Sequence, residues 1–410
     1  MAARQLASAT ILGALGLAVQ GAARFAHTTW VGNAAPDRLG TLSALLSVSV
    51  FLTLLGPASA GIAAGRFAPA GAPLAAAHRR ELVRWMLRLS VALVPISVVV
   101  ALTLGGPTEV VLCAVLVLTY AWYLFTRGAL IGSGQVRRAA MLDIGTAVLT
   151  FAAVAAVIRG ELWSWLLLPP AVGYAAFAVL ARQPGPREEL PAEQARLVRA
   201  FLVTNTVAQV ATGALIPLTM LCVEWFDGAN SSAFGAALAL ATPPNMIAQA
   251  MLLVLVPHFA TIAAAYGGRV PRRHAVAVLA ASAALWIVLF GAMVALAPWL
   301  LELVYPGRFP EAATTLRVLL VVMAVASFAM TPVALLVGSG RERQQAATAL
   351  AGVLAGVAVL VVAAPTLRSA GALAGFAVGI AVTTVAALVL SLREPARQGP
   401  VPGQPPPSAA

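Results

Sequence analysis

The stretch RQPGPREELPAEQARLVR, residues 182–199, divides the chain, because six long apolar runs come before it and six come after it. A helix needs about 20 apolar residues to cross a bilayer, so twelve spans and short loops occupy nearly all of the 410 residues. The chain is 61% hydrophobic and 10% charged, whereas soluble domains are about 25% charged. The sequence therefore predicts an all-α polytopic membrane protein without a sizeable soluble domain.

The apolar runs also predict how the chain is organised. The twelve spans are expected at residues 8–30, 40–64, 84–105, 109–131, 141–158, 163–181, 199–222, 233–257, 274–300, 312–337, 344–364 and 370–392. The chain therefore divides into four segments: a six-helix lobe at 1–181, a cytoplasmic linker at 182–198, a second six-helix lobe at 199–392, and a tail at 393–410. Because that tail is rich in proline, we expect it to be disordered.

The basic residues indicate the orientation in the membrane. All 26 are Arg, and nineteen of them fall in one set of alternating loops against four in the other set. Cytoplasmic loops carry such an excess of positive charge, so both termini are predicted to be cytoplasmic. The net charge of +12 thus reflects topology and not nucleic-acid binding. Abundant Ala, Gly, Val and Arg without Lys indicates a bacterial genome, and hence a bacterial cytoplasmic membrane.

Two pairs of similar segments, each six spans apart, indicate related halves. ALIGSGQVRRAAM (129–141) follows span four and ALLVGSGRERQQA (334–346) follows span ten, each with Gly-Ser-Gly before two arginines. RLGTLSALLSV (38–48) and AFGAALALATP (233–243) likewise open spans two and eight. A repeat of six spans keeps both halves in the same orientation, so a pseudo-twofold axis along the membrane normal is expected.

Polar side chains at helical spacing mark one face on each of three spans. They are Gln20, Arg24 and His27 on span one, Asn205 and Gln209 on span seven, and Asn245 and Gln249 on span eight. Lipid disfavours such faces, so we predict that they line a water-filled cleft between the lobes. Pro243 and Pro244 support a cavity there, because prolines leave helix carbonyls unpaired.

Other interpretations of these residues stay open. Arg24 can instead extend to the outer membrane interface, and His27 can lie at that interface without binding anything. The Asn and Gln side chains can instead form hydrogen bonds between helices. Asp143, at the start of span five, is expected to form a local ion pair with Arg137 and Arg138.

No sequence motif indicates an enzyme. The chain has no phosphate-binding loop of the Walker type and no His, Cys or Asp cluster at metal-ligand spacing. The loops are too short for a sugar-nucleotide site. We therefore expect no catalytic residue, no metal and no cofactor, and coupling to H⁺ or Na⁺ is left undecided.

The twelve spans in two lobes, the Gly-Ser-Gly exits and the segment 24–67 resemble the multidrug/oligosaccharidyl-lipid/polysaccharide (MOP) exporter superfamily, and within it the Wzx-type polysaccharide flippases. The resemblance implies alternating access and a cargo of undecaprenyl-pyrophosphate-linked oligosaccharide. The related lipid II flippases usually have fourteen spans, two more than here, and carry cavity arginines on the first span, for which Arg24 is the counterpart. The drug-exporting branch tends to use an intramembrane carboxylate, which the centre of span one lacks.

Three functions follow as hypotheses. The first is a flippase for a lipid-linked oligosaccharide, whose partners are the bilayer, the lipid-linked glycan, glycosyltransferases and a polysaccharide polymerase. The alternatives are a small-molecule exporter of the MATE-like or major facilitator-like kind, and a non-transporting scaffold of the cell envelope. The sequence indicates neither the sugar nor the oligomeric state.

Overall fold

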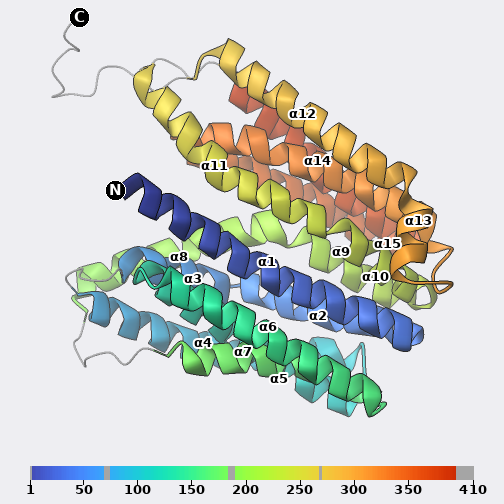
Figure 1. The fold of residues 1–410 in the computed structure, drawn as a ribbon. Helices are drawn as coiled ribbons and strands as arrows, with labels where there is room; N and C mark the ends of the chain where they lie inside the picture. The colour runs from blue at the N-terminus through green and yellow to red at the C-terminus, as the bar shows by residue number, and fades with distance from the viewer. Residues whose placement is uncertain (1, 69–73, 183–189, 267–269, 394–410) are drawn as a thin grey trace, which may run out of the picture.

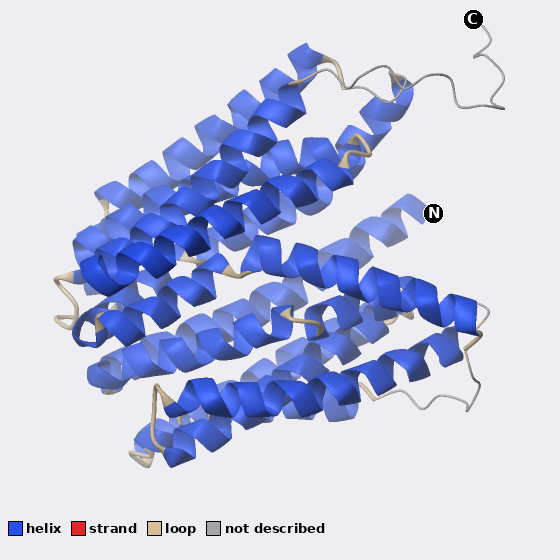
Figure 2. Cartoon of the chain, turned by 180° about the vertical axis from the view of Figure 1, so that it is seen from behind, coloured by secondary structure: helices blue, strands red, loops and turns tan. Residues whose placement is uncertain are grey.

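The computed structural model describes residues 2–68, 74–182, 190–266 and 270–393. Within these ranges the chain forms α-helices and two short 3₁₀ helices, and no strand (Figures 1 and 2). The predicted tail from residue 394 onward and residues 183–189 of the predicted linker lie outside the described residues.

The helices before the linker account for the first six predicted spans. They are α1 (Ala2–Ala34), η1 (Pro36–Arg38), α2 (Leu39–Leu54), α3 (Pro57–Phe67), α4 (Ala75–Leu102), α5 (Pro107–Gly132), α6 (Val136–Arg159), η2 (Trp163–Trp165) and α7 (Leu168–Leu180). Below, these helices are called the N-terminal half.

The helices after the linker account for the remaining spans. They are α8 (Ala192–Gly213), α9 (Leu215–Phe226), α10 (Gly228–Ala241), α11 (Pro243–Ala265), α12 (Arg272–Ala295), α13 (Ala297–Val304), α14 (Ala312–Gly338) and α15 (Glu342–Leu392). Below, these are called the C-terminal half. Figure 1 shows two groups of helices with α1 running between them.

Nine helical stretches in the described residues are long and apolar enough to cross a membrane, and the bent pair α8–α9 makes a tenth. One of the nine is α15, whose 51 residues would extend about 75 Å if straight, more than twice the hydrocarbon core. Counting both arms of α15 and adding α1 would give the predicted twelve, which stays a prediction.

The helix α15 reverses direction near Arg368, where the backbone leaves helical geometry (φ 55°, ψ −129°). Its two arms then pack closely through small residues. A Cβ on Gly375 would lie 3.0 Å from the carbonyl oxygen of Gly356, and a Cβ on Gly379 would lie 2.9 Å from that of Gly352. Small residues allow such close packing between membrane helices, so α15 is two antiparallel arms.

The two Gly-Ser-Gly sequences form the same helix end. Gly134 and Gly340 both have positive φ, 76° and 74°. After α5, Gln135 N donates to Leu130 O at 2.9 Å, and after α14, Arg341 N donates to Leu336 O at 2.8 Å. Both ends are therefore Schellman caps, in which a left-handed glycine lets the next amide satisfy a free helix carbonyl. The shared cap gives the sequence repeat a structural basis.

The helices also pack in the same order in each half. In the N-terminal half α1 contacts α6, α3 contacts α5, and α5 contacts α4 and α7. In the C-terminal half α9 contacts α15, α11 contacts α14, and α14 contacts α12 and α15. The second predicted span of each half is broken at a proline that begins a new helix, Pro57 or Pro243. This correspondence supports the proposed pseudo-twofold relation.

Side-chain contacts join the halves at the end where α1 stops and α2 begins. Asn33 Nδ2 donates to Val304 O at 2.8 Å, and Thr41 Oγ1 donates to Glu224 Oε1 at 2.8 Å. Gly40 N donates to Ser232 Oγ at 3.0 Å. We call these contacts the outer seal, because the predicted orientation places this end outside the cytoplasm.

The helix α8 packs against the N-terminal half although it follows the linker. Arg199 forms an ion pair with Glu81 of α4 at 3.0 Å, and Thr206 Oγ1 donates to Ser59 Oγ of α3 at 3.1 Å. The axis then bends by 56° between α8 and α9. The predicted span at 199–222 is therefore two helices, and its first part bridges the halves.

Candidate functional site

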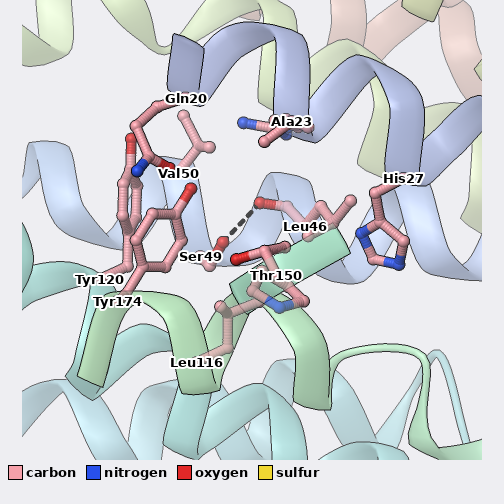
Figure 3. Close-up of a pocket in the computed structure, with 12 residues that line it drawn as sticks. Gln20, Ala23, His27, Leu46, Ser49, Val50, Leu116, Tyr120, Thr150 and Tyr174 are labelled. Atoms are coloured by element: carbon pink, nitrogen blue, oxygen red, sulfur yellow. Dashed lines mark hydrogen bonds between the residues drawn. The ribbon is translucent and has the colours of Figure 1, made fainter. Parts of the chain in front are cut away.

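The polar face predicted on span one lines a pocket in the N-terminal half. Gln20, Arg24 and His27 project from one side of α1, as their i, i+4, i+7 spacing requires, and helices α2, α5, α6 and α7 supply the other walls. Tyr120 and Tyr174 lie beside Gln20 at one end of the pocket, with their ring centroids 4.8 Å apart, and His27 lies at the other end (Figure 3). The pocket therefore lies within one half and not between the two.

The pocket is small in this conformation. The space for the centre of a water molecule amounts to about 20 Å³, which is enough for one or two waters. A drug-sized ligand occupies pockets of about 300–1,000 Å³. The arrangement can therefore hold water or a small ion, and a larger cargo requires the walls to move or must bind outside the pocket.

Gln20 ties α1 to α6. Its Nε2 donates to the carbonyl oxygen of Asp143 at 2.9 Å and to Thr146 Oγ1 at 3.1 Å. One turn earlier, Gly16 faces the Asp143 side chain so closely that an added Cβ would clash with it. The Gln20 Nε2 group therefore holds α1 against α6 in this conformation. The predicted role of Gln20 in binding a cargo stays a prediction.

His27 is almost completely buried at the other end of the pocket, with 1% of its surface exposed. Its Nε2 has no hydrogen-bond partner among the described residues. Because buried polar atoms are normally paired, this nitrogen is suited to a water molecule or a cargo atom in the pocket.

Arg24 lies between two sides of α1. Gly16 and Gln20 face α6, whereas Gly21 faces Met246 of α11 in the C-terminal half, where an added Cβ would clash. On a helix of 3.6 residues per turn, position 24 falls between these two sides. Arg24 is exposed and makes no ion pair within the described ranges. Its guanidinium is therefore available at the border of the pocket and the space between the halves.

Behind the pocket is a buried charged cluster that the sequence did not indicate. Asp143 is fully buried; its Oδ2 accepts from Arg127 Nε at 3.0 Å and its Oδ1 accepts from Tyr123 Oη at 2.9 Å. The expected local ion pair of Asp143 with Arg137 or Arg138 is wrong. Arg137 and Arg138 are exposed in the first turn of α6, whereas the buried Asp143 carboxylate faces α5 and pairs with Arg127.

The four amide residues of spans seven and eight do not line this pocket. Asn205 Nδ2 on α8 and Asn245 Oδ1 on α11 are buried without partners among the described residues, and Gln249 is exposed. Gln209 is half-buried on α8. The structure therefore brings together three of the seven predicted residues, and the grouping of all seven around one cleft stays a prediction.

Sequence comparison identifies no relative: no protein-family model matches the chain, and no curated protein matches it. Comparison of the structures does find similar proteins. A multidrug resistance MATE family transporter of the MOP superfamily, solved in an inward-facing conformation, superposes with a TM-score of 0.75 at 13% identity, over 92% of this chain and 97% of that one.

Two further structures support the same fold. An outward-facing conformation of a multidrug resistance MATE family transporter gives a TM-score of 0.63 at 14% identity, over 94% of each chain. A MOP superfamily transporter from Pyrococcus furiosus Vc1 (DSM3638), described as having a binding pocket of reverse polarity, gives 0.64 at 14% identity, again over 94% of each chain. The chain thus has the same fold as these transporters.

Proposed function

We propose that this chain is an alternating-access transporter that moves a lipid-linked, pyrophosphate-bearing oligosaccharide across the bacterial cytoplasmic membrane. The fold supports transport, since similar structures are transporters solved in inward-facing and outward-facing conformations. The cargo is inferred from the charge of the site. Glycosyltransferases that build the glycan and a polymerase that consumes it would be its functional partners.

The observation that carries the cargo proposal is Arg24. It stands at the border between the pocket and the inter-half space without an acidic partner among the described residues. A charge within a membrane span is costly unless it is paired or functional. A guanidinium stays charged in any surroundings and binds phosphate oxygens through two parallel hydrogen bonds. An anionic head group would supply the missing partner.

The buried carboxylate near the pocket does not favour a cationic cargo. Asp143 is already paired with Arg127 at 3.0 Å and accepts a hydrogen bond from Tyr123. A carboxylate so neutralised offers little attraction to an organic cation. The charge that a cargo meets on α1 is therefore the positive charge of Arg24.

A small-molecule exporter is the second candidate, because two of the similar structures are multidrug resistance transporters. The rings of Tyr120 and Tyr174 in the pocket wall are tilted by 34° to each other, and their faces would suit contact with an aromatic compound. The relative described as having a reversed pocket polarity supports the view that this fold serves cargoes of different charge.

The conformation fits the inward-facing state of such a cycle. The outer seal joins the halves through Asn33, Thr41 and Gly40, and the TM-score is higher for the inward-facing relative than for the outward-facing one. Cargo would then enter from the cytoplasmic side, and the outer seal would have to break for its release.

Binding to the purified chain tests the cargo. We expect undecaprenyl pyrophosphate to bind tighter than undecaprenol, and Arg24→Ala to weaken pyrophosphate binding by about ten- to hundredfold, the usual value of a charged hydrogen-bonding contact. Arg24→Lys should keep part of the affinity, because the charge remains but the fork geometry is lost.

Arg88→Ala is the matched control, since Arg88 is another exposed arginine within a predicted span, on α4. It should bind as the unchanged chain does. Equal affinity for the pyrophosphate and the alcohol, or full binding by Arg24→Ala, would contradict the proposed cargo and leave the small-molecule exporter as the better interpretation.

A further inference from the structure

We propose that His258 and His274 form a binding site for a divalent transition-metal ion of the Zn²⁺ class, which joins α11 to α12. The two imidazoles belong to consecutive helices of the C-terminal half. His258 lies in the last two turns of α11, and His274 lies in the first turn of α12. They are sixteen residues apart in the sequence, on either side of the loop between these helices.

The geometry of the pair suits two ligands of one ion. The Nε2 atoms are 3.1 Å apart, and the ring centroids are 5.3 Å apart with the planes inclined at 40°. Zinc binds imidazole nitrogen at about 2.0–2.1 Å, so two nitrogens at tetrahedral positions are separated by about 3.4 Å. A small outward movement of either ring would therefore admit the ion between the two nitrogens.

The hydrogen bond between the rings is exposed, and the two histidines lie just at the ends of the predicted spans 233–257 and 274–300, where we expect solution to reach them. No group of three or more His, Cys, Asp or Glu suited to a metal occurs in the described ranges, so water would complete the coordination shell. Neutral imidazole is a ligand for Zn²⁺, Cu²⁺ and Ni²⁺, whereas Mg²⁺ prefers oxygen. The site should thus select borderline metals over hard cations.

Neighbouring charge limits the affinity. Arg272 and Arg273 directly precede His274 and are both exposed, so they repel a cation through solvent. Because the site has only two protein ligands and lies beside two arginines, we expect moderate affinity for the metal. Its occupancy would then change with the concentration of free metal ion. When filled, it would fix the end of α11 to α12, and α11 is the helix whose Met246 meets α1 at Gly21.

The experiment is a calorimetric titration of the full-length, tag-free chain in detergent with Zn²⁺, and separately with Mg²⁺. We expect about one Zn²⁺ per chain and no Mg²⁺ binding. His258→Asn and His274→Asn should each weaken Zn²⁺ binding by about tenfold or more, because each removes half of the protein ligands. His78→Asn removes a histidine of α4 far from the pair in the sequence and should bind Zn²⁺ as the unchanged chain does.

A second measurement guards against misfolding. Without metal, the thermal unfolding temperatures of His258→Asn and His274→Asn should equal that of the unchanged chain, and Zn²⁺ should raise the temperature only of the unchanged chain and of His78→Asn. No Zn²⁺ binding to the unchanged chain, or equal binding by properly folded pair variants, would overturn the proposal. The pair would then be two imidazoles that share one hydrogen bond.

Discussion

Asp143 links the helices behind the pocket through its buried side chain. Its carboxylate is fully buried and joins Arg127 of α5 to the α6 backbone that Gln20 holds. Breaking a buried ion pair by removing one partner usually costs about 3–5 kcal/mol. We therefore predict that Asp143→Ala markedly lowers the thermal unfolding temperature of the detergent-solubilised chain.

Asp37→Ala is the control for this prediction, because Asp37 is an exposed acidic residue in η1. Its unfolding temperature should stay within experimental error of the unchanged chain. An Asp143→Ala chain as stable as Asp37→Ala would show that the buried pair contributes little to the fold.

Single residues also show what the sequence could and could not predict. The spacing of Gln20, Arg24 and His27 predicted their common face, since helix geometry alone determines it. The partner predicted for Asp143 was wrong because Arg127 lies on the preceding helix α5, and its approach depends on how α5 and α6 pack. The pairing of His258 with His274 was missed for the same reason, as it depends on how α11 and α12 meet.

At the scale of elements, the two Schellman caps give a paired prediction. Gly134 and Gly340 both adopt left-handed backbone and have no atom within 4 Å of an added Cβ. Alanine there would suffer only from the conformation, at about 1–2 kcal/mol. We predict that Gly134→Ala and Gly340→Ala each destabilise the chain by a similar amount in thermal unfolding.

Two other glycines provide matched controls. Gly145 in α6 and Gly291 in α12 also have open space around an added Cβ, but their backbone is helical. Alanine at these positions should stabilise by about 0.5–1 kcal/mol. If all four variants behaved alike, the caps would not explain the Gly-Ser-Gly repeat.

The helices were largely predictable where the sequence is a long apolar run. The positions at which a helix bends or ends were less predictable. Hydropathy indicated where the long helices lie, and the Gly-Ser-Gly sequences marked two helix ends without indicating that they are Schellman caps. The bend between α8 and α9 and the packing of α8 on the N-terminal half depend on contacts such as Thr206 with Ser59. Those contacts join segments 147 residues apart, so no local pattern could indicate them.

At the scale of the whole molecule, the proposed transport cycle requires the outer seal to open. Gly235 of α10 meets Ser43 of α2 across the halves, where an added Cβ would lie 3.3 Å from Ser43 Cβ. Disulfides span Cβ atoms about 3.5–4.5 Å apart. In a chain with Cys113 and Cys222 replaced, we predict that Ser43→Cys with Gly235→Cys forms a disulfide on oxidation and stops transport.

Reduction of this disulfide should restore transport, and Ser43→Cys alone should transport under both conditions. Mass spectrometry of the cross-linked peptides would confirm the bond. A fully cross-linked chain that still transports would show that the halves need not separate at this end, contrary to the proposed cycle.

In the proposed mechanism, Arg24 enables the movement of a pyrophosphate-linked lipid across the bilayer. The most direct measurement reconstitutes the chain in liposomes with a fluorescent undecaprenyl-pyrophosphate glycolipid and adds an impermeant quencher outside. We predict that label from the inner leaflet becomes accessible with the unchanged chain and with Arg88→Ala, but that Arg24→Ala resembles liposomes without protein. Equal transbilayer movement with Arg24→Ala and with the unchanged chain would show that Arg24 is not needed for this movement.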